Sequence, residues 1–222
     1  MARTLPDGTL CVIVSDGAGS APFGGQGASL VCRTMARHLA EWFANSAEMP
    51  EEERVLDWLD DVRDTLSAIA KKREVTRRQF AATMALLAVR GEELVAAQVG
   101  DSSIVGRATG AWEAICWPDS GELASTTYFV TDDPEVRLNF VRGPLVQDGF
   151  AVFSDGIEMI ALKHAELRPH PGFFDPMMRP VDAAGGSGKL TELSNALGRY
   201  LDGPAVCDRT DDDKTLVLVS GA

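Results

Sequence analysis

Short apolar runs separated by turn residues occupy much of the chain and predict strands. Leu10–Val14 and Phe150–Phe153 are continuous apolar runs of five and four residues, which is typical of buried strands. Between them, a series of runs separated by Arg-Gly, Gly-Asp and Thr-Gly turns predicts an antiparallel meander. The runs of this series are Ala82–Val89, Glu93–Val99, Ser103–Arg107 and Ala111–Trp117. Less regular strand patterns cover Tyr128–Thr131 and Leu138–Val141, and Thr215–Val219 predicts a last strand.

Apolar residues spaced by three and four predict helices on either side of this series. After a glycine-rich loop over Gly17–Gly27, one apolar stripe covers Leu30–Phe43 and a second covers Val55–Ile69. The later part of the chain predicts, in order, a helix from Ile157 to about Leu167, a proline-rich loop or flap over Arg168–Gly188, and a helix over Leu190–Leu201. Helices and strands grouped in this way predict an α+β fold.

Composition narrows the classes of protein that fit. The chain has 222 residues, 45% apolar and 24% charged, which predicts one globular domain over residues 1–222. Its net charge of −12 argues against binding to nucleic acid or to anionic membranes. No apolar run suffices for a membrane-spanning helix, and the N-terminus lacks the apolar segment of a signal peptide. The four cysteines form no Cys-x-x-Cys motif, so a cytoplasmic location is expected.

Two copies of Ser-Asp-Gly, each directly after a predicted buried strand, are the most informative motif. They place Asp16 and Asp155 at strand ends, where a carboxylate is held in a fixed position and the next glycine permits a sharp turn. Asp-Gly is also a common hairpin turn, and Asp7-Gly8 and Asp148-Gly149 precede strands as plain turns do. Asp16 and Asp155 lead into helical sequence instead. Their spacing by itself leaves both a metal site and a plain turn open.

Aspartates mark two further strand edges. Asp101 follows the strand over Glu93–Val99, and the triplet 211–213 leads into the last strand. A triple-aspartate run on its own is typical of a solvated turn. Four converging carboxylate clusters would repel one another unless cations lie between them, and Mg²⁺ and Mn²⁺ prefer oxygen ligands of this kind. The chain shows no Ser/His/Asp or Cys/His arrangement that predicts a nucleophilic side chain.

The order of these motifs resembles the metal-dependent protein phosphatase family, the protein phosphatase 2C type. The matching segments are Ser15-Asp16-Gly17-Ala18-Gly19, Gly100-Asp101-Ser102, Ser154-Asp155-Gly156 and Asp212-Asp213-Lys214-Thr215. Thr126–Thr131, Pro169–Phe174 and Arg209–Leu218 further resemble a bacterial branch of the family. The resemblance implies a four-layer α-β-β-α sandwich, in which two antiparallel sheets are flanked by helices.

The resemblance also implies a site for two Mn²⁺ or Mg²⁺ ions between the sheets. By motif, the metal ligands would be Asp16, the carbonyl of Gly17, Asp101, Asp155 and Asp212. Asp16 would bridge two metals, and Asp101 with Asp155 would hold a third, looser one. Asp213 would contact the ligands without binding a metal itself. Asp16 and Asp155 would be catalytic because they hold the metal-activated water that attacks phosphorus.

The implied activity is that of a Mn²⁺- or Mg²⁺-dependent serine/threonine protein phosphatase. Its substrate would be a phosphorylated protein, and a Ser/Thr kinase would be its partner. No protein nucleophile is required for attack by water, which agrees with the absence of a recognisable one in this sequence.

One departure from the family pattern concerns the stretch before Asp16. Family members have a strand there that supplies an acidic metal ligand and, in many members, a phosphate-binding arginine. Only fifteen residues precede Asp16, Asp7-Gly8 is expected to be a turn, and Arg3 is the sole upstream arginine. The domain is therefore expected to lack the first N-terminal strand of the family. Two alternatives stay open: a catalytically weakened regulatory or binding module, and a hydrolase of small phosphorylated molecules.

Overall fold

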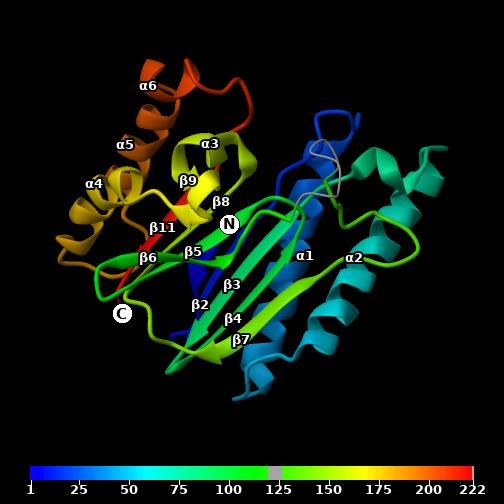
Figure 1. Cartoon of the computed structure of the whole chain (residues 1–222). Helices are drawn as coiled ribbons and strands as arrows, with labels where there is room; N and C mark the ends of the chain where they lie inside the picture. The colour runs from blue at the N-terminus through cyan, green and yellow to red at the C-terminus, as the bar shows by residue number, and fades with distance from the viewer. Residues whose placement is uncertain (120–126, 222) are drawn as a thin grey trace.

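Two antiparallel sheets face each other in the centre of the protein (Figure 1). The computed structural model describes residues 1–119 and 127–221. The first sheet has the order β1-β2-β3-β4-β7, with β1 (Ala2–Thr4), β2 (Leu10–Val14), β3 (Met84–Arg90), β4 (Glu93–Val99) and β7 (Asn139–Pro144). The second has the order β11-β8-β5-β6, with β11 (Leu216–Ser220), β8 (Gly149–Phe153), β5 (Ser103–Ala108) and β6 (Ala111–Cys116).

Alternate side chains of the strands build separate cores on the two faces of each sheet. Val12 and Val14 of β2 pack with Phe150 of β8 in the core between the sheets. Cys11 and Ile13 lie on the other face of β2, in the core formed with helices. Successive side chains of a strand point to opposite faces, so a strand that is buried on both faces reads as a continuous apolar run.

Helices cover the outer face of each sheet and complete the predicted four-layer α-β-β-α sandwich (Figure 1). The first sheet is covered by α1 (Gly24–Asn45) and α2 (Glu52–Lys72). The second is covered by α4 (Pro171–Asp182), α5 (Thr191–Leu201) and α6 (Pro204–Cys207). The α+β prediction is therefore confirmed. Among the described helices, none combines the length and apolar character needed to cross a bilayer.

The prediction of a loop or flap over Arg168–Gly188 is wrong, because most of this segment is helix α4. Pro171 occupies the first turn of α4, where a proline needs no backbone N–H partner. Phe174 and Met178 are fully buried in the core against the second sheet. Burial of this apolar face stabilises a helix that the prolines inside it, Pro176 and Pro180, disfavour.

The prediction of one helix from Ile157 to about Leu167 is also wrong. The segment contains only the short helix α3 (Glu158–Ala161), flanked by single 3₁₀ turns and by β9 (Leu162–Lys163). β9 pairs with β10 (Arg168–Pro169), and Leu167 between them has a φ of 49°. A left-handed residue and a strand pairing both interrupt helical hydrogen bonding.

The four predicted strands are confirmed as β3 to β6, with ends shifted by at most two residues, but the prediction of one meander is wrong. β3 and β4 pair in the first sheet and β5 and β6 in the second, because the chain crosses from one sheet to the other at residues 100–102. The pattern over Leu138–Val141 corresponds to β7. Tyr128–Thr131 form no strand: Val130 lies in a turn, and its N–H donates to the carbonyl of Ala82. Thr126, the first residue of the segment that resembles the bacterial branch, lies outside the described residues.

The stretch before β2 contains the short strand β1, which pairs antiparallel with β2. Asp7 forms the predicted turn and accepts hydrogen bonds from the N–H and the hydroxyl of Thr9. The Arg3 guanidinium donates to the carbonyl of Ala36 in α1, on the helical face of the sheet. None of the β1 residues is acidic, so β1 supplies no carboxylate ligand. The lack of the ligand-bearing strand of the family stays a prediction.

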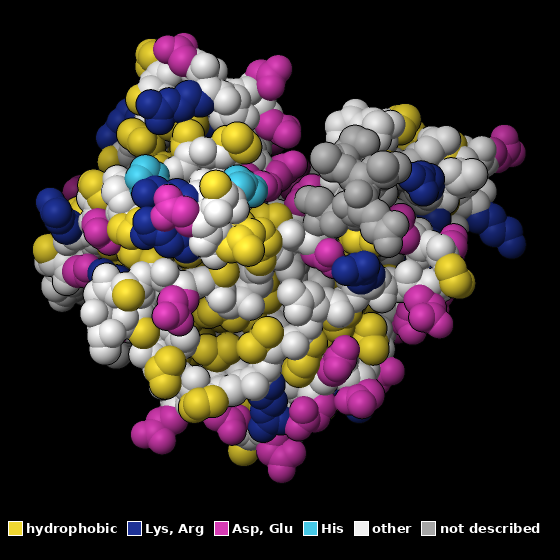
Figure 2. Space-filling view, viewed as in Figure 1, with side chains coloured by type: hydrophobic (Ala, Val, Ile, Leu, Met, Phe, Trp, Pro, Cys, Tyr) yellow, Lys and Arg dark blue, Asp and Glu magenta, His cyan; other side chains and the backbone are white. Residues whose placement is uncertain are grey.

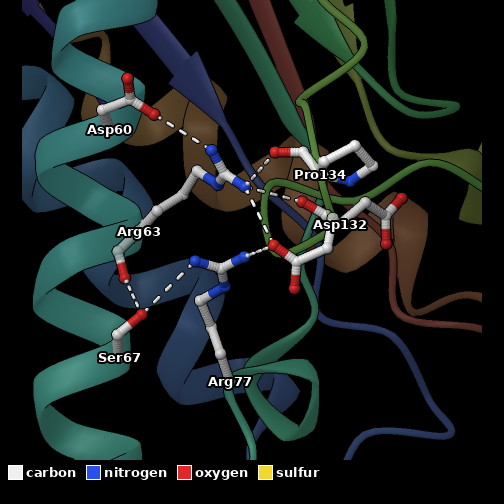
Figure 3. A network of polar contacts seen from close by, with 7 residues as sticks. Asp60, Arg63, Ser67, Arg77, Asp132 and Pro134 are labelled. Atoms are coloured by element: carbon white, nitrogen blue, oxygen red, sulfur yellow. Dashed lines mark hydrogen bonds and ion pairs between the residues drawn. The ribbon is translucent and has the colours of Figure 1, made fainter.

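Two arginines connect α2 with the loop over 132–134 (Figure 3). Arg63 donates to the carbonyl oxygens of Asp132 and Pro134 at 2.9 and 3.2 Å. Arg63 and Arg77 both contact the same carboxylate oxygen of Asp133. Their side chains are only 13% and 18% exposed, and we call this group, with its loop, the arginine clamp.

Candidate active site

Four aspartates at strand edges converge at one end of the sandwich. Asp16 follows β2, Asp101 follows β4, Asp155 follows β8, and Asp212 precedes β11. Asp16, Asp101 and Asp212 all lie close enough to Asp155 for their charges to raise its pKa. The structure thus brings together the four predicted carboxylate positions from both sheets.

The end of β2 is held by hydrogen bonds to the start of β3. The Asp16 N–H donates to the Thr83 hydroxyl at 3.1 Å, and the Thr83 N–H donates to the Asp16 carbonyl at 2.8 Å. The Ser15 hydroxyl donates to the Thr83 carbonyl at 2.6 Å. The Thr83 hydroxyl also lies 3.1 Å from that of Ser102, beside Asp101. These bonds fix the Asp16 backbone.

Gly17 lies where the chain passes very close to the start of α1. A Cβ at this position would lie 2.2 Å from the carbonyl carbon of Gly24, so only glycine fits here. The next residue, Ala18, donates its N–H to the carbonyl of Ala81 at 3.0 Å. In the described part of the chain, the Gly17 carbonyl accepts no hydrogen bond. This carbonyl is therefore available to a ligand.

The turn after β8 is packed against the segment that enters β11. The Ser154 N–H donates to the Thr215 carbonyl, and the Thr215 N–H donates to the Ser154 hydroxyl, both at 3.1 Å. A Cβ at Gly156 would lie 2.1 Å from the Asp213 carbonyl oxygen. The Asp213 N–H donates to the Asp212 carboxylate at 2.8 Å. Asp155 and Asp212 are thereby held in fixed relation through backbone contacts.

Asp101 is positioned by a glycine and a threonine. Gly100 has a φ of 92°, and a Cβ there would lie 2.5 Å from the Tyr128 carbonyl oxygen, which again requires glycine. The Thr127 hydroxyl donates to the Asp101 carboxylate at 2.7 Å. The segment from Thr127 onward therefore forms one wall beside Asp101.

The carboxylates at the centre of the site are both partly buried and crowded. Burial raises the pKa of Asp16, and the charges of Asp212 and Asp213 raise it further. Burial also raises the pKa of Asp155 to about 7, with added repulsion from Asp101, Asp16 and Asp212. A carboxyl group of this kind gives up its proton readily only when a positive charge replaces it.

Glu158 is a member of this acidic group that the sequence analysis did not single out. Burial, together with the charge of Asp101, raises the pKa of Glu158 to about 7. Its carboxylate lies 3.0 Å from Nε2 of His164, whose ring packs edge-on against Trp117. Glu158 follows Asp155 by three residues, a helical spacing that places two side chains on one face and offered a signal for it.

A cavity of about 440 Å³ opens beside Asp16. Its walls come from the end of β2, the first turns of α1, the end of α5 and the segment before β11. The charged side chains among them are Asp16, Asp202, Asp213 and Lys214. Asp202 and Lys214 were not singled out from the sequence either. Acidic side chains also gather around a hollow in the upper middle of Figure 2.

The donors at this site fit a divalent cation. Several carboxylates with raised pKa values lie beside a free carbonyl, and oxygen donors of these two kinds are what Mg²⁺ and Mn²⁺ bind. As the side chains now lie, no three Asp, Glu, His or Cys side chains of the described residues form a complete metal-binding group. Repulsion between carboxylates that no cation neutralises opposes a closer arrangement.

Comparison with known proteins assigns the family. A sequence profile of the protein phosphatase 2C family matches residues 1–201. The chain belongs to this family. It is 32% identical over 210 residues to serine/threonine-protein phosphatase 3 of Escherichia coli K12, a similarity that covers 94% of this chain and 83% of that protein.

Solved structures of the family share the fold of this protein phosphatase 2C member. The catalytic domain of serine threonine protein phosphatase PstP, in complex with two manganese ions, matches with a TM-score of 0.63 and 14% identity, covering 96% of this chain and 86% of that one. PppA, described as a key regulatory component of T6SS in Pseudomonas aeruginosa, matches with a TM-score of 0.66 and 21% identity, covering 100% of this chain and 90% of that one. These similarities support the four-layer architecture.

Proposed function

We propose that this protein phosphatase 2C member is a Mn²⁺- or Mg²⁺-dependent serine/threonine protein phosphatase. The observation that carries the proposal is the convergence of Asp16, Asp101, Asp155 and Asp212, with burial and crowding that raise the pKa of Asp155 to about 7. Such a group of carboxylates repels a phosphate dianion until cations neutralise it. Family membership supports phosphoprotein substrates, and the manganese-bound PstP domain supports the choice of metal.

In this proposal Asp16 and the carbonyl of Gly17 would contribute oxygen ligands to the ions, and the remaining carboxylates would complete the ligand set. The residues that would hold the ions are Asp16, Gly17, Asp155 and Asp212, with Asp101 and Asp155 for a third ion. When bound, the ions supply a water of lowered pKa and offset the charge of the phosphoryl oxygens. Asp213 keeps Asp212 oriented, because its N–H donates to that carboxylate.

The chain's own residues hold the carboxylates of the site in position. Hydrogen bonds to Thr83 fix the backbone of Asp16, and the contact of Gly156 with Asp213 fixes the distance between the β8 and β11 sides. Held in this way, the carboxylates need little rearrangement when a substrate binds. A phosphorylated protein would be the substrate, and a Ser/Thr kinase the opposing enzyme. The four free cysteines support the proposed cytoplasmic location.

A regulatory or binding module that has kept the fold is the second candidate. The observation in its favour is that β1 carries no acidic residue and that Arg3 contacts α1 instead of the site. Such a module would bind phosphoprotein weakly or not at all through this site and would not turn it over.

The test is hydrolysis of p-nitrophenyl phosphate and of a phosphothreonine peptide, with and without millimolar Mn²⁺. Asp16→Ala is expected to lower kcat/KM by at least about 100-fold, because even indirect partners of metal ligands are worth 10- to 100-fold. Asp7→Ala is the matched control, since Asp7 also precedes glycine but forms a plain turn with Thr9. No Mn²⁺-dependent turnover by the folded wild-type chain would favour the regulatory module. Turnover of the small ester alone would favour a hydrolase of small molecules.

A further inference from the structure

Lys214 is the one cation among the residues that line the cavity beside Asp16. It lies in the segment that enters β11, and the other charged residues of the lining are three aspartates. When both metal ions are bound, the phosphoryl group of a substrate still carries negative charge. A cation in the wall of the cavity would attract it. Lys214 is therefore a candidate to bind such a group.

The stem of Lys214 is held in place, whereas most of its donor capacity is free. Its Nζ donates to the Asp212 carbonyl at 3.0 Å, and its Cγ lies 3.4 Å from the point where Gly156 would carry a Cβ. Within the described residues, the Lys214 ammonium group bonds to the Asp212 carbonyl and to no carboxylate, although Asp212 and Asp213 precede it directly in the chain. An ammonium group has three N–H donors, so two remain for a ligand in the cavity.

Arg3, the sole arginine or lysine before Asp16, does not line this cavity. Arg3 precedes β2, but its guanidinium is bonded to the Ala36 carbonyl on the helical face of the first sheet. Arg3 pairs across the strands with Cys11, which packs into the core with α1. The side of β2 that carries Arg3 is therefore the side away from the space between the sheets.

We propose that Lys214 binds the phosphoryl oxygens of the substrate and of the released phosphate in this cavity. The identity of the ligand rests on the proposed phosphatase function. A merely structural lysine would instead serve to hold the Asp212–Thr215 segment through its bond to the Asp212 carbonyl. If Lys214 binds phosphate, removal of its charge lowers the affinity for phosphate. If Lys214 only holds the segment with Asp212, removal of its charge lowers the affinity for metal.

The experiment compares wild type with Lys214→Met, which keeps the length of the stem and removes the charge, and with Lys214→Arg, which keeps the charge. Lys189→Met is the matched control, because Lys189 is exposed in the loop before α5. KM, kcat and the inhibition constant of inorganic phosphate are measured at saturating Mn²⁺. Mn²⁺ affinity is measured separately by calorimetry.

For Lys214→Met, we expect KM and the phosphate inhibition constant to rise together by about 10- to 100-fold, the loss of one hydrogen bond to a charged group. We expect kcat and Mn²⁺ affinity to change by less than about threefold, because the lost interaction stabilises the bound substrate and the transition state equally. Lys214→Arg should restore most of the affinity, and Lys189→Met should match wild type. An unchanged phosphate inhibition constant, or a fall in Mn²⁺ affinity that accounts for the whole defect, would overturn the proposal.

A direct titration of inorganic phosphate into the Mn²⁺-loaded protein separates this proposal from the proposed function. If the wild-type chain lacks turnover, the proposed function fails, yet phosphate binding that Lys214→Met abolishes would still support the role of Lys214. Equal binding by the two proteins, or no binding by wild type, would refute that role.

Discussion

The acidic site and the arginine clamp are two charged regions that differ in whether their charges are paired. In the clamp, Arg63 and Arg77 meet the Asp133 carboxylate and two backbone carbonyls. In the site, Asp16, Asp101, Asp155 and Asp212 face one another, and burial with repulsion raises the pKa of Asp155 to about 7. The segment from Thr127 to Pro134 joins them, since Thr127 bonds to Asp101 and Pro134 bonds to Arg63.

The difference shows which charges serve the fold and which serve a ligand. Removing one partner of a partly buried, hydrogen-bonded charge pair destabilises the folded chain, whether or not a metal ion is bound elsewhere. Like charges gathered without a partner destabilise it until an ion binds. The clamp should therefore contribute stability without metal, whereas the site should oppose folding without metal and contribute stability with it.

The largest effect is expected from breaking the clamp. Arg63→Met removes hydrogen bonds to two carbonyls and to carboxylates from a side chain that is 13% exposed. We expect the free energy of unfolding to fall by about 2–4 kcal/mol, and equally with and without Mn²⁺. Urea denaturation under both conditions measures it. A loss that Mn²⁺ reverses would contradict the separation of the two regions.

A somewhat smaller effect is expected at the contact that joins β8 to β11. Gly156→Ala places a Cβ 2.1 Å from the Asp213 carbonyl oxygen, so the backbone must shift. We expect a loss of about 1–3 kcal/mol in stability, as for other overpacked positions, together with weakened Mn²⁺ binding. Gly198→Ala in α5 is the control: nothing lies near its Cβ, and alanine favours a helix by up to about 1 kcal/mol. Equal behaviour of the two variants would refute the contact.

Removing a crowded charge should stabilise the metal-free chain. The folded pKa of Asp155 is raised to about 7 from 3.8, so the folded state binds the extra proton, and stability falls as the pH rises from about 4 through 7. In EDTA at pH 7.5, Asp155→Asn should add about 1–3 kcal/mol, a range that allows for partial exposure of the site.

The same variant should show no gain below about pH 4, where the carboxyl group is protonated in both the folded and the unfolded chain. With Mn²⁺ present, the sign should reverse, because the variant loses a ligand. Urea denaturation at pH 4 and pH 7.5 provides the measurement. A gain of equal size at both values would show that charge is not its cause.

The smallest effect is expected from an exposed ion pair on the same helix as Arg63. Arg54 pairs with Asp57 at 3.0 Å in α2, with 47% and 63% of the two side chains exposed. Arg54→Met should change stability by less than about 0.5 kcal/mol. A change as large as that for Arg63→Met would mean that the stability lost at Arg63 does not depend on its burial and pairing.

The sequence identified the parts of the site that lie at strand ends. A buried strand reads as an apolar run, and an aspartate directly after it has a defined place, so Asp16, Asp101 and Asp155 were found in this way. Asp212 needed the order of motifs as well, because a triple-aspartate run alone resembles a solvated turn. The four-layer arrangement came from the resemblance and is confirmed by the structure.

The remaining features depend on contacts between distant segments or on burial. α4 contains two internal prolines, and only the burial of Phe174 and Met178 shows why it is a helix. Arg63 and Pro134 are 71 residues apart, so local patterns carry no sign of the clamp. Lys214 reads as an ordinary surface lysine until the cavity beside Asp16 is seen.

The most direct test of the central claim is calorimetric titration of the metal-free chain with Mn²⁺ at pH 6 in two buffers of different ionisation enthalpy. Burial and the neighbouring carboxylates raise the pKa of Asp155 to about 7, so we expect metal binding at pH 6 to displace a proton from the acidic site. The account predicts Mn²⁺ binding with release of about one proton at pH 6, and with much less at pH 8.5. Mn²⁺ binding without proton release, or no binding by the folded chain, would contradict it.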